Sequence, residues 1–99
     1  MTRIQVNGTW FDRDAATLYE EATRWNGSNH ISVATGSQWE HEELFRSRKG
    51  RWFIHSWSQW QGSTPSWAEV DEEAATIWLI RNECDLPKDL AAKAEALEV

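Results

Sequence analysis

The stretch QWEHEELFRSRKGRWFIHSWSQW, residues 38–60, predicts a long β-hairpin with two strands of about ten residues each. Aromatic and β-branched residues lie on both sides of Lys49-Gly50, which we expect to be the two turn residues. In this register Phe45 faces Ile54 on the same side of the sheet. A slip of one residue would move every side chain to the other face, so the turn decides which residues are core.

The same register divides the tryptophans of the hairpin between two faces. Trp52 and Trp60 lie on one face and are predicted to be core, since burying one tryptophan removes roughly 150 to 250 Å² from water. Trp57 lies on the other face beside Glu42, and Trp67 follows in a loop. Trp57 and Trp67 are therefore the predicted half-exposed anchors of a protein contact, with Trp60 at the loop as an alternative.

Two further elements are predicted before this hairpin. RIQVNGTWFD, residues 3–12, places two β-prone runs around Asn7-Gly8, a pair typical of tight hairpin turns. Asp12 or Asp14 then provides a cap for a helix. Apolar residues follow at helical spacing at Ala15, Leu18, Tyr19, Ala22 and Trp25. The pattern predicts a hairpin followed by a helix.

The remaining segments predict one more strand and two more helices. HISVAT, residues 30–35, is a strand candidate. After a loop at residues 62–66, DEEAATIWLIRNE (71–83) is typical of a helix with Asp71 as its cap. A last helix is expected to begin near Pro87.

Together these segments predict an α+β fold, with a small antiparallel sheet built from a hairpin and a long hairpin. Two or three helices are expected to pack on it. The 99 residues suit a single domain, 1–99, whose C-terminal helix (85–99) is expected at the periphery. No apolar run is long enough to span a bilayer, and the single Cys84 is typical of a cytoplasmic protein, so a location in the host cytoplasm is expected.

The negative charge is concentrated in the last third of the chain. Residues 1–68 hold seven acidic and seven basic residues, whereas residues 69–99 hold nine acidic and three basic residues, so the net charge of −6 arises there. An acidic surface attracts basic partners and repels phosphate backbones. The predicted partner-binding residues are Glu40, Glu42, Trp57, Trp67, Glu69, Asp71, Glu72 and Glu73.

No catalytic or metal-binding set emerges from the sequence. His41-Glu42 begins like the zinc motif H-E-x-x-H, but Phe45 stands where the second histidine is required. His41 and His55 lie on opposite faces in the register above, which disfavours a shared metal. We therefore expect no enzyme activity, no catalytic residues, no metal and no cofactor.

Three motifs, VNGTWFDRDAA, EELFRSRKGRWFIHSWSQW and VDEEAATIWLIRNE, resemble a loosely defined group of small proteins encoded by phages, prophages and plasmids. The resemblance covers about residues 4–84. Its matching positions are Asn7, Gly8, Asp12, Asp14, Glu42 or Glu43, Leu44, Phe45, Arg46, Gly50, Trp52, Phe53, Glu72, Glu73, Ala74, Trp78 and Leu79. The glycine-rich stretch of the group is replaced by HSWSQWQGSTPSW. The resemblance implies the fold and an origin in a mobile genetic element.

These observations favour a non-enzymatic inhibitor that binds a host protein, of the anti-CRISPR type, with a CRISPR effector complex as a possible partner. Its acidic and tryptophan-bearing surfaces would block a site that binds nucleic acid. The alternative is a nucleic-acid-binding accessory protein that uses the basic turn Arg46–Arg51 and neighbouring aromatic residues. The net charge of −6 disfavours this alternative.

Overall fold

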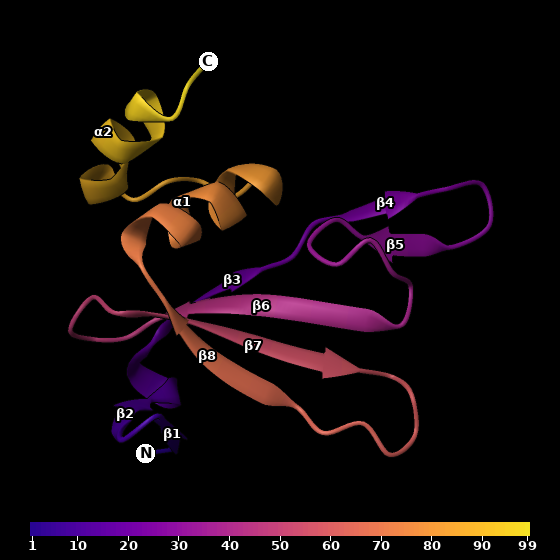
Figure 1. The fold of residues 1–99 in the computed structure, drawn as a ribbon, viewed down its shortest axis with the longest axis horizontal. Helices are drawn as coiled ribbons and strands as arrows, with labels where there is room; N and C mark the ends of the chain where they lie inside the picture. Colours follow the sequence, from indigo (N-terminus) through magenta and orange to yellow (C-terminus); the bar gives the residue numbers. More distant parts are fainter.

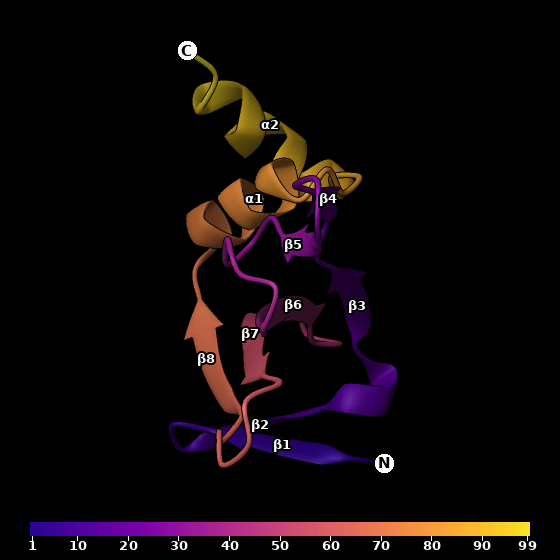
Figure 2. The same cartoon turned by 90° about the vertical axis from the view of Figure 1, so that its right-hand side faces the viewer.

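The computed structural model describes residues 1–99 and has three layers (Figures 1 and 2). In chain order the elements are β1 (Arg3–Val6), β2 (Thr9–Asp12), the 3-10 helix η1 (Arg13–Ala15), β3 (Thr17–Glu20), β4 (Thr23–Trp25), β5 (His30–Ser32), β6 (Glu40–Arg46), β7 (Trp52–Ser58), β8 (Ser66–Val70), α1 (Glu72–Arg81) and α2 (Lys88–Ala96). A four-stranded sheet lies between the β1–β2 hairpin and the two α-helices. The predicted α+β class is confirmed.

The β6–β7 hairpin turns through Arg48, Lys49 and Gly50, one residue more than predicted. The N–H of Ser47 donates to the carbonyl of Arg51 at 2.7 Å, and the N–H of Gly50 donates to the carbonyl of Ser47 at 2.9 Å. Gly50 has a φ of 88°, which glycine adopts without a steric penalty. This is the three-residue hairpin loop in which the last residue is left-handed.

The additional loop residue shifts the strand register by one position. Phe45 pairs with Phe53 and Leu44 pairs with Ile54, so the predicted pairing of Phe45 with Ile54 is wrong. Leu44 and Trp52 face the helices, whereas Phe45 and Phe53 face the β1–β2 hairpin. The prediction that Trp52 is core is confirmed, because only 1% of its surface is exposed.

The central sheet has the strand order β3-β6-β7-β8, and every neighbouring pair is antiparallel. The strands of the long hairpin have seven residues each, fewer than the ten expected. β8 forms where a loop was expected, and it pairs Trp67 with His55. The sheet therefore has one strand on each side of the hairpin.

Residues 12–25 do not form the predicted helix. The carboxylate of Asp12 does accept the N–H of Asp14 at 3.0 Å, but the turn ends after Arg13–Ala15. The next residues, Thr17–Glu20, form β3 and pair with β6. This pairing satisfies backbone groups on an edge of β6 that would otherwise be open. Tertiary hydrogen bonding thus overrides the helical spacing of the apolar residues.

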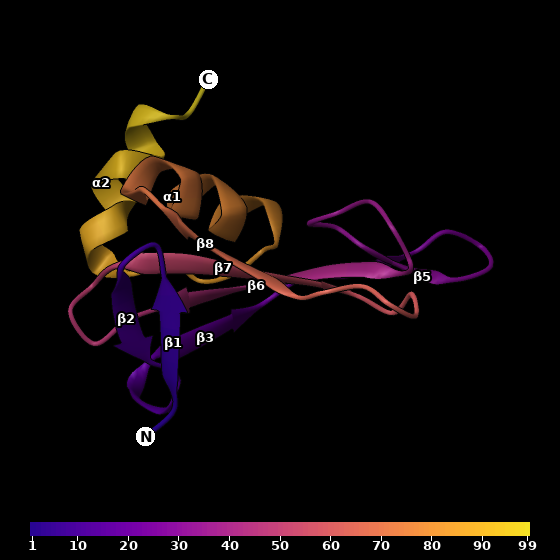
Figure 3. The same ribbon diagram turned by 60° about the horizontal axis from the view of Figure 1, so that its bottom comes forward.

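The two short hairpins have different positions in the molecule. The predicted Asn7-Gly8 turn is confirmed, with φ values of 46° and 81°. Val6 and Phe11 pack this hairpin against the sheet face opposite the helices (Figure 3). The predicted strand in HISVAT is confirmed at His30–Ser32, where it pairs with β4 and projects from the end of the sheet (Figure 1).

The helices cover the other face of the sheet. α1 begins at the predicted cap, because the Asp71 carboxylate accepts the N–H of Ala74 at 2.8 Å. α2 follows Pro87, close to its predicted start. Trp78 of α1 and Leu90 of α2 are buried in the core between the helices and the sheet. Neither helix is long and apolar enough to cross a bilayer.

Candidate functional site

Two exposed tryptophans meet where the long hairpin ends. Trp39 precedes β6 and Trp60 follows β7, and the N–H of Gln59 donates to the carbonyl of Trp39 at 2.8 Å beyond the strand ends. This bond keeps the two segments together, and the indole centroids of Trp39 and Trp60 lie 5.2 Å apart at 47°. The rings are 42% and 60% exposed, so the pair contributes little to either core. The prediction that Trp60 is core is wrong.

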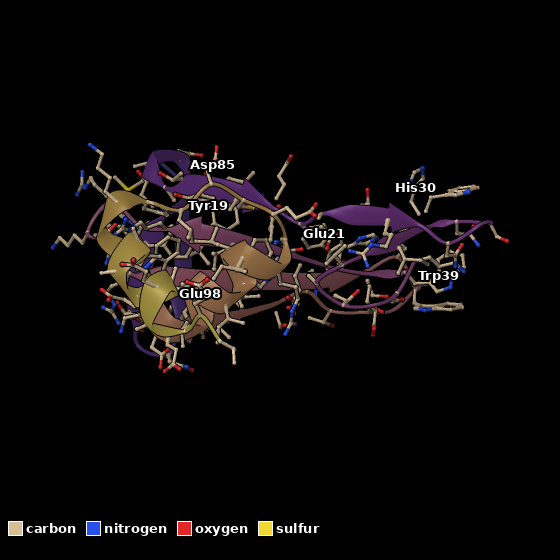
Figure 4. All side chains as sticks on the ribbon, turned by 90° about the horizontal axis from the view of Figure 1, so that it is seen from above. Tyr19, Glu21, His30, Trp39, Asp85 and Glu98 are labelled. Carbon is tan, nitrogen blue, oxygen red and sulfur yellow. The ribbon has the colours of Figure 1, made fainter.

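The β4–β5 hairpin brings more aromatic surface to this end of the molecule. Trp25 is 58% exposed, and its ring meets that of His30 edge-on with centroids 5.1 Å apart. Figure 4 shows His30 and Trp39 at one end and Glu98 at the other. We call the surface formed by Trp25, His30, Trp39 and Trp60 the tryptophan end.

A polar groove of about 540 Å³ lies on the sheet at the end of the long hairpin that carries Trp39 and Trp60. Its lining consists mainly of carboxylates and hydroxyls: Thr35, Glu40, His41, Glu42, Ser56, Trp57, Ser58, Ser63, Thr64 and Ser66. We call it the acidic groove. Glu40 is exposed and has no ion pair, so its charge is available to a ligand.

The second carboxylate of the groove is held by the fold. Glu42 Oε1 accepts a hydrogen bond from Trp78 Nε1 at 3.0 Å, which links β6 to α1. Its backbone N–H donates to Glu21 Oε1 at 2.7 Å. Hydrogen bonds therefore hold both the side chain and the backbone of Glu42, whereas they hold only the backbone of Glu40.

Glu40, Glu42 and Trp57, three of the predicted partner-binding residues, line the acidic groove. Trp57 pairs with His41 and Glu42 pairs with Ser56, so the prediction that Trp57 lies on the same face as Glu42 is wrong. The acidic residues Glu69, Asp71, Glu72 and Glu73 lie apart from the groove, at the end of β8 and the start of α1. Asp71 is committed to the helix cap and Glu69 to an ion pair, so only Glu72 and Glu73 have unengaged carboxylates there.

Trp67 is not the loop anchor that the sequence suggests. It lies in β8, and its ring stacks on His55 with centroids 4.2 Å apart. The rings of Phe11 and Phe45 lie within 5.6 Å of its ring centroid on other sides. Trp67 is therefore a half-buried residue of β8 that packs against the core beneath the β1–β2 hairpin.

The two histidines of the long hairpin share a face, contrary to the predicted register. Their rings flank Trp57, with centroids 5.6 Å away for His41 and 5.1 Å away for His55. His41 Nδ1 lies 2.7 Å from Glu21 Oε2, and His55 Nδ1 lies 2.9 Å from Glu43 Oε1. No three His, Cys, Asp or Glu side chains are arranged to hold a metal ion.

The basic turn is partly neutralised by acidic neighbours. Arg46 forms a two-bond ion pair with Asp89, and Arg51 binds Glu69 through two contacts of 2.6 Å. These hydrogen bonds hold the pKa of Asp89 and of Glu69 below their ordinary values. They also raise the pKa of both arginines. Two cations of the predicted cluster are therefore engaged within the protein.

Trp25 and Trp39 are the exposed aromatic residues of the tryptophan end that sequence reasoning missed. Trp25 was assigned to the apolar stripe of a helix that does not form. A hairpin that turns at Lys49-Gly50 places Trp39 opposite Trp60, which correctly indicates that the two residues are close but not that they are exposed. A side chain at the end of a strand is buried only if another segment packs over it. Neither helix extends to the end of the sheet near the β4–β5 hairpin (Figure 1).

Comparison of the sequence with models of known protein families found no match. Searches of curated proteins and of solved structures also found no similar protein. The function proposed below is therefore inferred from the side chains of this chain and their arrangement.

Proposed function

We propose that the protein acts by binding another protein, without catalysis, through the tryptophan end and the adjoining acidic groove. The observation that carries the proposal is the exposed Trp39–Trp60 pair beside the unengaged carboxylate of Glu40. Tryptophan is enriched among the residues that dominate binding energy in protein interfaces. Two large rings held by a hairpin end lose little conformational entropy on binding.

The partner is expected to present a basic surface. The groove contributes Glu40 and Glu42, and the whole chain has a net charge of −6. Complementary charge steers association and selects against acidic partners. An arginine or lysine side chain of the partner suits this place, since the cation can lie against an indole face while it binds a carboxylate.

The specific form of this proposal is an inhibitor from a mobile genetic element that acts in the host cytoplasm on a CRISPR effector complex. The basic surfaces of such complexes bind nucleic acid, and carboxylates of the inhibitor would occupy the places of phosphates. The resemblance of the sequence motifs to phage, prophage and plasmid proteins supports the origin. The acidic groove and the tryptophan end support this mode of action.

The test measures target-DNA binding by purified single-protein and multisubunit CRISPR effectors with and without the protein. We expect loss of target binding for at least one effector. Trp39→Ala combined with Trp60→Ala should weaken inhibition by about 30-fold or more, because the loss of even one hot-spot ring costs about 2 kcal/mol. Direct affinity is measured by biolayer interferometry on the same effector.

The charge component is tested with matched reversals. Glu40→Lys should weaken binding, and Glu98→Lys, which makes the same charge change at the opposite end (Figure 4), should not. Glu42→Lys is unsuitable, because it removes the acceptor of the Trp78 indole. Unchanged target binding across all effector types would exclude the CRISPR form of the proposal. Equal effects of Glu40→Lys and Glu98→Lys would exclude the groove as the contact.

A further inference from the structure

A second groove, of about 260 Å³, lies between the β1–β2 hairpin and the β6–β7 turn. Figure 3 shows both elements at the end of the sheet opposite the β4–β5 hairpin. The lining of this second groove combines aromatic and basic residues with a few polar ones: Thr9, Trp10, Phe11, Asp12, Ser47, Arg48, Lys49, Arg51 and Phe53. We call it the basic groove. It lies outside the tryptophan end and the acidic groove.

Trp10 supplies an exposed aromatic surface to this groove. It alternates with the inward-facing Phe11, so its ring lies on the outer side of the hairpin and is 52% exposed. The Arg3 guanidinium lies 5.0 Å from the centroid of the Trp10 ring. Val6 and Phe11 already anchor the hairpin to the core. The Trp10 ring is therefore not needed to hold the hairpin in place.

The groove is locally positive although the chain is acidic. Arg48 and Lys49 are exposed and form no ion pair. Asp12 Oδ1 accepts the backbone N–H groups of Thr2 and Asp14, so one of the two carboxylate oxygens of Asp12 is engaged within the chain. Basic residues outnumber acidic residues in and around the groove. The basic residues are Arg3, Arg48, Lys49 and Arg51, and the acidic residues are Asp12 and Glu69.

We propose that the basic groove binds single-stranded nucleic acid, with one base stacked on Trp10 and the neighbouring phosphates on Arg48 and Lys49. Single-strand binding sites combine an aromatic platform with cations that follow the backbone. Stacking on a side chain requires a base that is not already stacked in a duplex, which favours the single strand. The site is independent of the proposed protein contact.

The proposed site differs from the nucleic-acid interface that the sequence suggests at the Arg46–Arg51 turn, because it uses only part of that turn. Arg46 is bound to Asp89, and Phe53 is only 1% exposed, so neither is available to a ligand. Trp10 comes from a different hairpin and provides the stacking surface instead. The juxtaposition of Trp10 with Arg48 and Lys49 exists only in the folded chain.

The experiment measures fluorescence anisotropy of a labelled oligothymidine of about 12 nucleotides as the full-length protein is titrated at several salt concentrations. Trp10→Ala should weaken binding by about 5-fold to 150-fold, the range found for removing one stacked base. Arg48→Glu with Lys49→Glu should weaken binding far more than the control below and flatten the salt dependence of the affinity that remains. Each phosphate contact to a single strand contributes a slope of about −0.7 in log affinity against log salt.

The matched control is Lys88→Glu with Lys93→Glu, which makes the same charge change on α2 and should bind like the wild type. Circular dichroism and urea unfolding show whether each variant is folded. The proposal is overturned if the wild type binds no oligonucleotide at low salt, or if the control loses as much affinity as Arg48→Glu with Lys49→Glu. Equal affinity for a duplex, or displacement of the oligonucleotide by inorganic phosphate alone, would likewise overturn it.

Discussion

At the scale of single residues, the side chain of Glu21 organises the segment between β3 and β6. Its carboxylate accepts the Ser32 hydroxyl and the backbone N–H of Glu42, each at 2.7 Å, and lies against His41 Nδ1. Only 11% of the side chain is exposed. One carboxylate thus connects β5 and β6 next to the acidic groove.

Replacing this residue is expected to be costly. Glu21→Ala leaves three buried polar groups without their partner, and each unsatisfied group costs about 1–3 kcal/mol. We expect the free energy of unfolding to fall by about 2–4 kcal/mol in urea titrations, after allowance for water entering the site. Glu20→Ala, at the exposed neighbouring position, should change it by less than about 0.5 kcal/mol. Equal effects of the two substitutions would contradict this role of Glu21.

At the scale of secondary-structure elements, local hydrogen bonds determine where segments begin and turn. The Asp71 carboxylate accepts the Ala74 N–H and so begins α1. Gly50 takes a left-handed conformation and so gives the β6–β7 hairpin its three-residue loop. Both are short-range interactions, but the loop also decides which face of the sheet each strand residue occupies.

The helix cap gives a direct test at this scale. Asp71→Ala should reduce the free energy of unfolding by about 1 kcal/mol, because an N–H in the first turn of α1 loses its acceptor. Asp71→Ser keeps a capping oxygen and should retain most of the stability. Urea unfolding monitored by far-ultraviolet circular dichroism measures both variants. If serine lost as much stability as alanine, the charge or another contact of Asp71 would be responsible instead of the cap.

For the molecule as a whole, the acidic and the basic surface grooves lie at different ends of the central sheet. The tryptophan end and the acidic groove lie toward the β4–β5 hairpin, and the basic groove lies at the β6–β7 turn. Figure 3 shows this hairpin and this turn at opposite ends of the sheet. Ion pairs also join elements that are distant in the sequence: Arg46 of β6 binds Asp89 of α2, and Arg51 binds Glu69 of β8. These pairs link the stability of the fold to pH.

The pH dependence has a definite sign. The pKa values of Asp89 and Glu69 are lowered in the folded protein from ordinary values of 3.8 and 4.5. Their contribution to stability is therefore present above these ordinary values and is lost as pH falls through the lowered ones. Asp89→Asn should make the acid side of the stability curve shallower, whereas Asp85→Asn should not.

Thermal unfolding between neutral pH and pH about 2 measures this effect. Both carboxylates are near the surface, so high salt should weaken the pH dependence by screening the ion pairs. An unchanged acid limb in Asp89→Asn would show that the Arg46–Asp89 pair does not contribute to stability. Asp85 is a suitable control, because it lies in the connection that precedes α2 and forms no ion pair (Figure 4).

Sequence patterns are sufficient to predict the features that depend on neighbours within a few positions. The Asn7-Gly8 turn and the Asp71 cap were predictable, because each depends on backbone angles or hydrogen bonds that span about four residues. The α+β class was also predictable, since alternating and helical patterns occur in separate segments. For the candidate site, the sequence indicated Glu40 and Trp57 from charge and residue type.

The pairing of each strand and the burial of each aromatic ring depend on contacts between segments that are distant in the sequence. Residues 17–20 have helical spacing but pair with β6, because an open strand edge offers more hydrogen bonds than a short isolated helix. One additional loop residue moved Phe45 to the face opposite Ile54. Trp67 packs against the core and Trp60 remains exposed because packing over a sheet comes from distant segments, and no local pattern in a sequence records where those segments end.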